Sequence, residues 1–201
     1  MRSFRLFSHK QKGRIIQMQI NDLRKFITNA VLSIFAIATL SSIGLAFDDE
    51  NKETPELPAG CGTLHVEAGN KVSFHAYAVG VQIYRWNGVG WDFVAPSAKL
   101  FTDSGFRGFV GDHYAGPTWE SSTGSKVVAR RVDGCTPNAT AIPWLLLEAV
   151  TTDGFGIFAK TAFIQRINTG GGLAPSTAGL FVGYEQKVPY IAEYYFYRAD
   201  N

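Results

Sequence analysis

Cysteine is scarce in this chain of 201 residues, and the scarcity narrows the chemistry that the chain can perform. The two cysteines, Cys61 and Cys135, do not form a Cys-x-x-Cys pair. A structural zinc site uses paired Cys or His ligands at short spacing, so the sequence disfavours such a site. No serine stands in a Gly-x-Ser-x-Gly turn, so a hydrolase nucleophile of that kind has no support either.

A sustained helical period is also missing, apart from the N-terminal leader. Turn-forming Gly, Asn and Asp residues instead recur at short intervals between stretches rich in aromatic and β-branched residues. This pattern predicts an all-β fold, a single antiparallel β-sandwich or β-barrel. Residues 144–147 (Trp-Leu-Leu-Leu) are the one run that would fit a buried helical turn equally well.

Residues 1–46 have the pattern of an N-terminal signal peptide. Basic residues precede the apolar run 30–40, and Gly44 and Ala46 provide the small residues of a cleavage site. Met18 would itself start a leader of ordinary length. An uncleaved anchor is the alternative, but the apolar run is shorter than a membrane span prefers. We expect cleavage after Ala46, a secreted or periplasmic location, and membrane contact only through the uncleaved leader.

The chain has no surplus of positive charge once the leader is set aside. Its formal net charge is +2, but the leader holds seven Lys and Arg against one acid, Asp22. Residues 47–201 therefore carry 12 basic and 16 acidic residues, a formal net charge of −4. A protein that follows phosphates needs a basic patch in its folded domain, so we expect no nucleic-acid partner.

After the leader the composition indicates one globular domain. Residues 47–58 are acidic and contain proline, which is typical of a disordered spacer. Residues 59–201 show no linker and are long enough to bury a core, so they form a single β domain. In an exported domain, Cys61 and Cys135 are most simply one disulfide, and two separate buried thiols are the alternative.

Several segments have the alternation of strands. In residues 188–197 every second residue is apolar or aromatic, and in residues 71–83 apolar residues alternate with small or polar ones. The Asn87-Gly88 turn predicts a hairpin that places Trp86 opposite Trp91. Further turns are expected at Thr123-Gly124 and Asp153-Gly154.

The segment of residues 111–120 is chemically the densest, and with other segments it resembles a known family. The chain is similar to exported bacterial and fungal proteins grouped as domain of unknown function 3455, whose fungal members include some labelled malate dehydrogenase. The matching segments cover most of residues 80–197, in order: residues 80–84, 91, 95–96, 113–120, 124–125, 142–146, 164–171, 174–175 and 188–197. The resemblance implies a domain and a compartment, and no reaction.

The dehydrogenase label does not fit the residues. A nicotinamide-binding site needs a Gly-rich turn between a strand and a helix, with the pyrophosphate on backbone N–H groups. Gly170, Gly171 and Gly172 follow an expected strand, but no helical pattern comes after them and the required spacing is absent. The sequence therefore indicates no nicotinamide enzyme and identifies no other cofactor.

His113 is the leading candidate for catalysis, together with Asp112 and Glu120. A histidine beside carboxylates can perform acid–base chemistry or hold a metal ion. The structural alternative is that His113 bonds a backbone carbonyl and orders its turn. His65 and His75 could join it in a three-histidine metal site, although nothing in their spacing requires one, and our prediction is that there is no metal.

Arg166 and Asn168 are the second cluster, expected on one face of a strand that ends in glycine. A ligand could approach the backbone closely there, or the two residues could simply form the rim of the sheet. Four aromatic residues are the candidate stacking surfaces for a ligand: Tyr84, Trp86, Trp91 and Trp119.

Two functions are compatible with these residues. The first is an exported module that binds a small molecule or an extracellular polymer through the aromatic residues, with Arg166 or Asn168 as polar anchors. The second is an exported enzyme or metal protein that uses His113 with Asp112 or Glu120. Because no recognised catalytic set is present, the sequence favours the binding module. Either function requires the polar groups to gather near His113 and Arg166 in one site.

Overall fold

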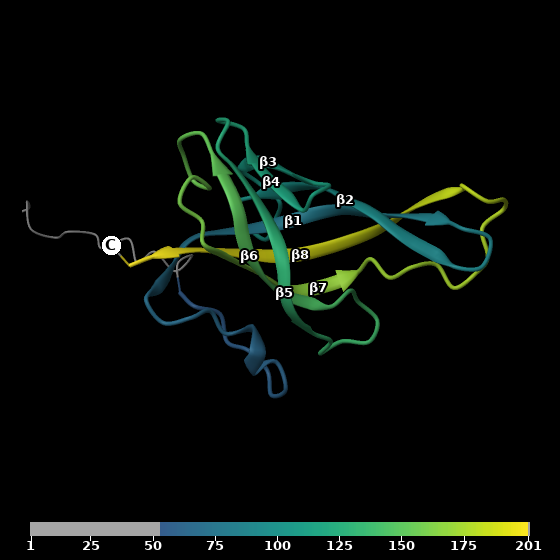
Figure 1. The fold of residues 1–201 in the computed structure, drawn as a ribbon, viewed down its shortest axis with the longest axis horizontal. Helices are drawn as coiled ribbons and strands as arrows, with labels where there is room; N and C mark the ends of the chain where they lie inside the picture. The colour runs from purple at the N-terminus through teal and green to yellow at the C-terminus, as the bar shows by residue number, and fades with distance from the viewer. Residues whose placement is uncertain (1–52, 201) are drawn as a thin grey trace, which may run out of the picture. The chain divides into compact units, whose positions relative to one another are not determined.

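The computed structural model describes residues 53–200, and these residues form an antiparallel β-barrel (Figure 1). Each strand pairs with the next along the chain, and the last strand pairs with the first, which closes the ring. The all-β prediction is confirmed, with the barrel as the architecture. The predicted signal peptide and the first part of the spacer lie outside the described residues. The strands are β1 (Asn70–Trp86), β2 (Trp91–Phe101), β3 (Phe109–Tyr114), β4 (Thr118–Ser121), β5 (Lys126–Cys135), β6 (Trp144–Asp153), β7 (Phe163–Gly171) and β8 (Glu185–Ala199).

The alternation along β1 and β8 places the core inside the barrel. On β8, Tyr190, Ala192, Tyr194 and Phe196 are buried, as their spacing predicts. Side chains at every second position of a strand point to one face, so a sheet that curls on that face encloses them. The enclosed aromatic residues pack edge to face, for example Trp119 against Tyr194 with ring centroids 5.3 Å apart.

Beyond one end of the barrel, β1, β2 and β8 extend into a tongue, which we define as residues 84–93 and 173–186 (Figure 1). The predicted hairpin at its tip is confirmed, with Trp86 directly opposite Trp91 and their ring centroids 5.5 Å apart. Asn87 fixes the turn because its side-chain oxygen accepts hydrogen bonds from the backbone N–H groups of Val89 and Gly90.

Residues 144–147 form part of strand β6, which resolves the helix-or-strand ambiguity of that run. The connection from β6 to β7 begins at Gly154, which has a φ of +70°, as the predicted turn requires. The same connection inserts Phe158 into the core, where it lies 4.6 Å from the ring centroid of Phe196. The connection therefore adds an apolar side chain to the core of the barrel, where it also contacts Phe74 near the start of β1.

A disulfide joins Cys61 to Cys135, which confirms the predicted pair. It fastens the segment before β1, including the short helix η2 (Gly62–Leu64), to the end of β5. Leu64 is fully buried beneath it, and its carbonyl oxygen accepts a hydrogen bond from the side chain of Gln165. The segment therefore packs on the outside of the barrel as a second, smaller core.

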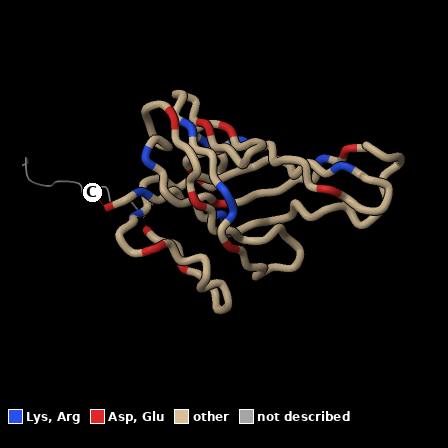
Figure 2. The backbone as a smooth tube through the Cα atoms, in the orientation of Figure 1, with Lys and Arg blue, Asp and Glu red and all other residues tan. Residues whose placement is uncertain are grey.

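Charged residues of both signs are interspersed along the strands and loops of the barrel (Figure 2). Surface pairs such as Lys99 with Asp112 and Arg85 with Glu185 account for several of them. Such exposed pairs each contribute little to stability. Within residues 53–200 the structure holds no helix that is long and apolar enough to span a membrane.

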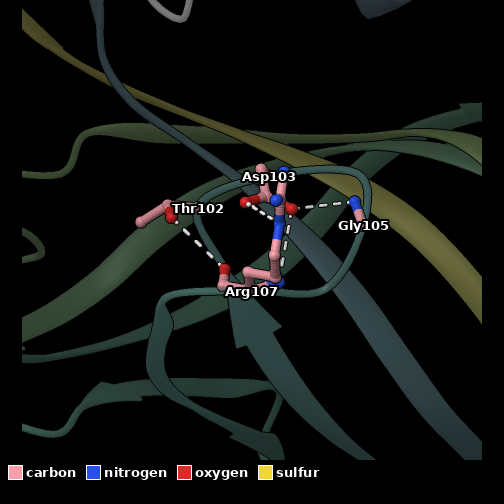
Figure 3. A network of polar contacts seen from close by, with 4 residues as sticks. All are labelled: Thr102, Asp103, Gly105 and Arg107. Atoms are coloured by element: carbon pink, nitrogen blue, oxygen red, sulfur yellow. Dashed lines mark hydrogen bonds and ion pairs between the residues drawn. The ribbon is translucent and has the colours of Figure 1, made fainter.

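The loop between β2 and β3 is ordered by Asp103 (Figure 3). Its carboxylate accepts hydrogen bonds from the backbone N–H groups of Gly105 and Arg107 and from the Arg107 side chain. Desolvation would raise the pKa of this carboxyl, but these bonds outweigh it and hold the pKa below its ordinary value. The network turns the chain between the two strands, and none of its residues lines the cavity described below.

Candidate functional site

A cavity of about 210 Å³ lies within the barrel. Every one of the eight strands contributes to its wall, together with the turn between β3 and β4. A pocket bordered by a closed ring of strands is a common place for a small ligand in barrels of this size. The lining residues are Gln82, Phe93, Val94, Pro96, His113, Ala115, Gly116, Pro117, Trp119, Arg131, Leu145, Leu147, Arg166 and Tyr194.

Most of the cavity wall is apolar, and its floor is the barrel core. Trp119, Leu147 and Tyr194 belong both to the lining and to the core cluster. Phe93 and Val94 are partly exposed and line the side where the tongue joins the barrel. The cavity is therefore a hollow above the packed core, with access beside the start of β2.

His113 is buried in the cavity wall rather than placed in a turn. It lies in β3, stacks on Trp119 with ring centroids 4.3 Å apart, and is 3% exposed. Its Nδ1 donates a hydrogen bond to the Thr118 carbonyl oxygen, 2.8 Å away. Because that nitrogen carries the proton of a neutral ring, Nε2 is left as the acceptor.

The imidazole of His113 is held neutral. Burial lowers its pKa to about 3, and the charge of Arg166 acts in the same direction, against the hydrogen bond to Thr118. A histidine with so low a pKa carries no charge at neutral pH and is a weak general base. Its role in the folded barrel is that of a neutral, stacked wall residue.

The low pKa of His113 predicts a pH-dependent stability. The unfolded chain takes up a proton below the ordinary pKa of 6.5, whereas the folded chain resists it down to about 3. The contribution of His113 to the free energy of unfolding is therefore fully present above pH 6.5. It falls by roughly 1.4 kcal/mol per pH unit as the pH drops from 6.5 toward about 3. Urea unfolding between neutral pH and about pH 5 should show this loss, and the variant His113→Asn should lack this component of it. Equal slopes for the two proteins would contradict the prediction.

Asp112 and Glu120 do not join His113. They lie opposite each other on β3 and β4 and face outward, as neighbours of inward-facing residues must in a strand. Asp112 pairs with Lys99, and Glu120 accepts a hydrogen bond from the Tyr114 hydroxyl, 2.5 Å away. The three candidate catalytic residues therefore do not converge, and no Asp or Glu lines the cavity.

Arg166 lines the same cavity as His113, so the structure brings these two residues into one site. Its Nε and Nη2 donate to the Pro143 carbonyl oxygen at 3.2 and 2.8 Å, which orients the guanidinium. In the described part of the chain, no carboxylate lies within ion-pair distance of Arg166. Burial raises the pKa of the Tyr194 phenol, and Arg166 opposes that rise through its charge and through a side-chain hydrogen bond to Tyr194.

Two of the side chains that line the cavity carry a buried N–H group with no protein acceptor. These groups are Nε2 of Gln82 and Nε1 of Trp119, in side chains that are 2% and 1% exposed. Within residues 53–200 only the hydroxyl of Thr161, which does not line the cavity, shares this condition. A buried donor without an acceptor costs about 1–3 kcal/mol of folding free energy. Two such donors in residues that line one cavity therefore indicate that a bound molecule supplies the missing acceptor.

The other candidate ligand-binding residues lie outside the cavity. Tyr84 donates a hydrogen bond from its hydroxyl to the Gly172 carbonyl oxygen and anchors the loop that follows β7. Trp86 and Trp91 pack against each other in the tongue, and Trp91 Nε1 donates to the Thr177 carbonyl oxygen. Of the four aromatic candidates, Trp119 is the one that the structure places in the cavity.

Asn168 does not share the face of Arg166. The register of β7 shifts between Ile167 and Gly170, and Asn168 has a φ of +49°. This irregularity interrupts the alternation, so Asn168 is exposed and its side-chain amide donates to Glu193 on the outer wall.

The three histidines also lie apart in their contacts. His75 is bonded to Glu193 and stacked on Tyr195, while His65 is exposed beside η2. In the described chain, no group of three or more His, Cys, Asp and Glu side chains could hold a metal ion. The structure therefore gives no support to a three-histidine metal site.

Two polar residues of the cavity lining, Gln82 and Arg131, were not predicted from the sequence, although a signal for Gln82 was present. The inward face expected for residues 71–83 includes Ala76 and Ala78, and the same alternation continues to Gln82. A lone amide on an apolar strand face is the pattern that would have identified it. Arg131 gives no such signal because β5 is irregular between Arg131 and Asp133.

One comparison with known proteins is informative. The model of the family described as "Protein of unknown function (DUF3455)" matches residues 67–198. This range covers all eight strands except the last residue of β8. No curated protein and no solved structure is significantly similar to the chain.

Proposed function

The chain belongs to the DUF3455 family of proteins of unknown function, and from that premise we propose that it is an exported barrel that binds a small molecule in its cavity. The observation that supports this most is the cavity itself, bordered by all eight strands, with Gln82 and Trp119, which carry unpaired donors, among its lining residues. Most ligand sites have the same build, an apolar hollow with a few convergent polar groups.

A small molecule suits this cavity better than an extracellular polymer does. The volume of about 210 Å³ lies below the roughly 300–1,000 Å³ of most ligand pockets, so it admits only a compact molecule. A polymer would need an exposed row of aromatic residues. Trp86 and Trp91 instead pack edge to face against each other, and Trp91 donates a hydrogen bond within the tongue. Export is supported by the leader pattern and is compatible with the disulfide between Cys61 and Cys135.

A screen of fragment-sized compounds by thermal shift tests the proposal. Leu145→Trp should reduce the hollow, because Leu145 lines the cavity and pairs in register with Arg166. Val150→Trp is the matched control on the same strand, since Val150 is 58% exposed and lies outside the cavity. We expect binding compounds to raise the Tm of the wild type and of Val150→Trp but not of Leu145→Trp. A screen without binders, or binders that act equally on all three proteins, would refute the site.

A further inference from the structure

The polar part of the cavity wall is strongly biased toward N–H donors. Gln82, Trp119, Arg131 and Arg166 all carry N–H groups. The side-chain acceptors of the lining are fewer, namely His113 Nε2, the Gln82 amide oxygen and the Tyr194 hydroxyl, and no carboxylate is among the lining residues. Arginine and indole nitrogens donate only, so a ligand that meets them has to supply acceptors. The bias is toward an acceptor-rich or anionic group on the ligand.

Arg166 is the strongest element of this set. Its two hydrogen bonds to the Pro143 carbonyl hold the guanidinium in place and leave N–H donors for another partner. It is partly buried, and within residues 53–200 no acid neutralises it. Five other basic residues, in contrast, each pair with a carboxylate on the outside: Lys71, Arg85, Lys99, Arg107 and Arg130.

The unpaired donors belong to two residues of the same cavity lining. Gln82 Nε2 and Trp119 Nε1 are almost fully buried and have no protein acceptor. Buried polar groups in native proteins are nearly always paired, so two unpaired donors in residues that line the same cavity as Arg166 point to an oxygen acceptor of a ligand. The rest of the wall, including Leu145, Leu147 and Pro96, suits an apolar body.

We propose that the ligand of this cavity is a small monocarboxylate with an apolar body, its carboxylate bound by Arg166 and by the N–H groups of Gln82 and Trp119. The planar guanidinium matches the planar carboxylate, which is the anion that arginine binds in two-point fashion. One fixed arginine and the small volume favour a single carboxylate over a bulkier phosphate dianion. The inference rests on the proposed function, because it names the ligand class of the same cavity.

Calorimetric titration of the exported protein with matched probes tests this assignment. Benzoate is compared with benzyl alcohol and benzylamine, and isovalerate with isoamyl alcohol, so that each series keeps its body and changes its charge. We expect each acid to bind at least about tenfold more tightly than its alcohol. Benzylamine should not bind, because it would place a cation beside Arg166.

Three variants assign the effect to the named groups. Arg166→Met should remove the preference for acids while leaving alcohol binding within about twofold of the wild type. Lys187→Met is the matched control, since it deletes one positive charge from an exposed residue that does not line the cavity. Gln82→Leu should weaken benzoate binding and at the same time raise the Tm of the ligand-free protein, because it removes an unpaired buried donor. A merely structural role of Gln82 would lower the Tm instead.

The outcomes separate this inference from the proposed function. If the acids do not bind more tightly than their alcohols, or if phenyl phosphate binds more tightly than benzoate, the carboxylate assignment is overturned. In that case compounds that bind the wild type but not Leu145→Trp still support a small-molecule site. If no compound distinguishes the wild type from Leu145→Trp, both proposals fail. Where Arg166→Met does not fold, Gln82→Leu and Trp119→Phe provide the same test.

Discussion

Removing the disulfide with the double variant Cys61→Ala and Cys135→Ala should lower the Tm by roughly 10 °C. The bond closes a loop with a sequence separation of 74, which in the chain-entropy treatment stabilises the folded state by about 4 kcal/mol. It also fastens the segment around Leu64, whose carbonyl oxygen is bonded to Gln165. Thermal unfolding followed by far-UV circular dichroism measures the shift.

Two controls define what this shift means. The wild type in the presence of a reducing agent should unfold at the temperature of the double variant. Because the disulfide lies in a core cluster separate from the cavity floor, the folded variant should still bind the compounds that the wild type binds. A Tm within about 2 °C of the wild type would contradict a stabilising role for the bond.

Replacing Trp119 by alanine should have an equally large effect on stability. Trp119 is 1% exposed and packs against His113, Tyr194 and Phe196. Truncation of a buried tryptophan costs about 3–5 kcal/mol, so the Tm should fall by roughly 10 °C. The variant enlarges the cavity, and indole should restore part of the lost Tm by filling it.

Trp119→Phe is the matched control for this truncation. It keeps an aromatic ring on His113 and removes the Nε1 donor, so its loss of stability should be much smaller than that of Trp119→Ala. If Trp119→Ala unfolds at nearly the wild-type temperature, or if indole stabilises the wild type as strongly as the variant, Trp119 does not form the floor of the cavity.

Local patterns predicted the elements of the barrel well, because they depend on neighbours in the sequence. Asn and Gly readily adopt the positive φ angles of a hairpin turn, so Asn87-Gly88 predicts the hairpin and the pairing of Trp86 with Trp91. The buried face of β8 follows from its alternation. Closure of the sheet depends on the pairing of β1 with β8, whose residues are more than 100 positions apart in places, and no local pattern encodes it.

The site was predictable only in part, for reasons that the strands make clear. His113 and Arg166 were expected to border one site and both line the cavity, as does Trp119, which was expected as a stacking surface for a ligand. Asp112 was expected beside His113 because a turn was assumed there, whereas an extended strand directs consecutive side chains to opposite faces. Asn168 was misplaced because a residue with positive φ breaks the alternation of β7.

The measurement that tests the central claim most directly is two-dimensional NMR of the side-chain N–H groups during titration with benzoate. The whole chain has four tryptophans, so three indole signals serve as internal controls for Trp119. Ligand binding in the barrel predicts that the Trp119 indole and the Gln82 amide signals shift, while those of Trp86, Trp91 and Trp144 stay in place. Shifts confined to the tongue tryptophans, or no shift of the Trp119 and Gln82 signals with any fragment that binds, would contradict a ligand site inside the barrel.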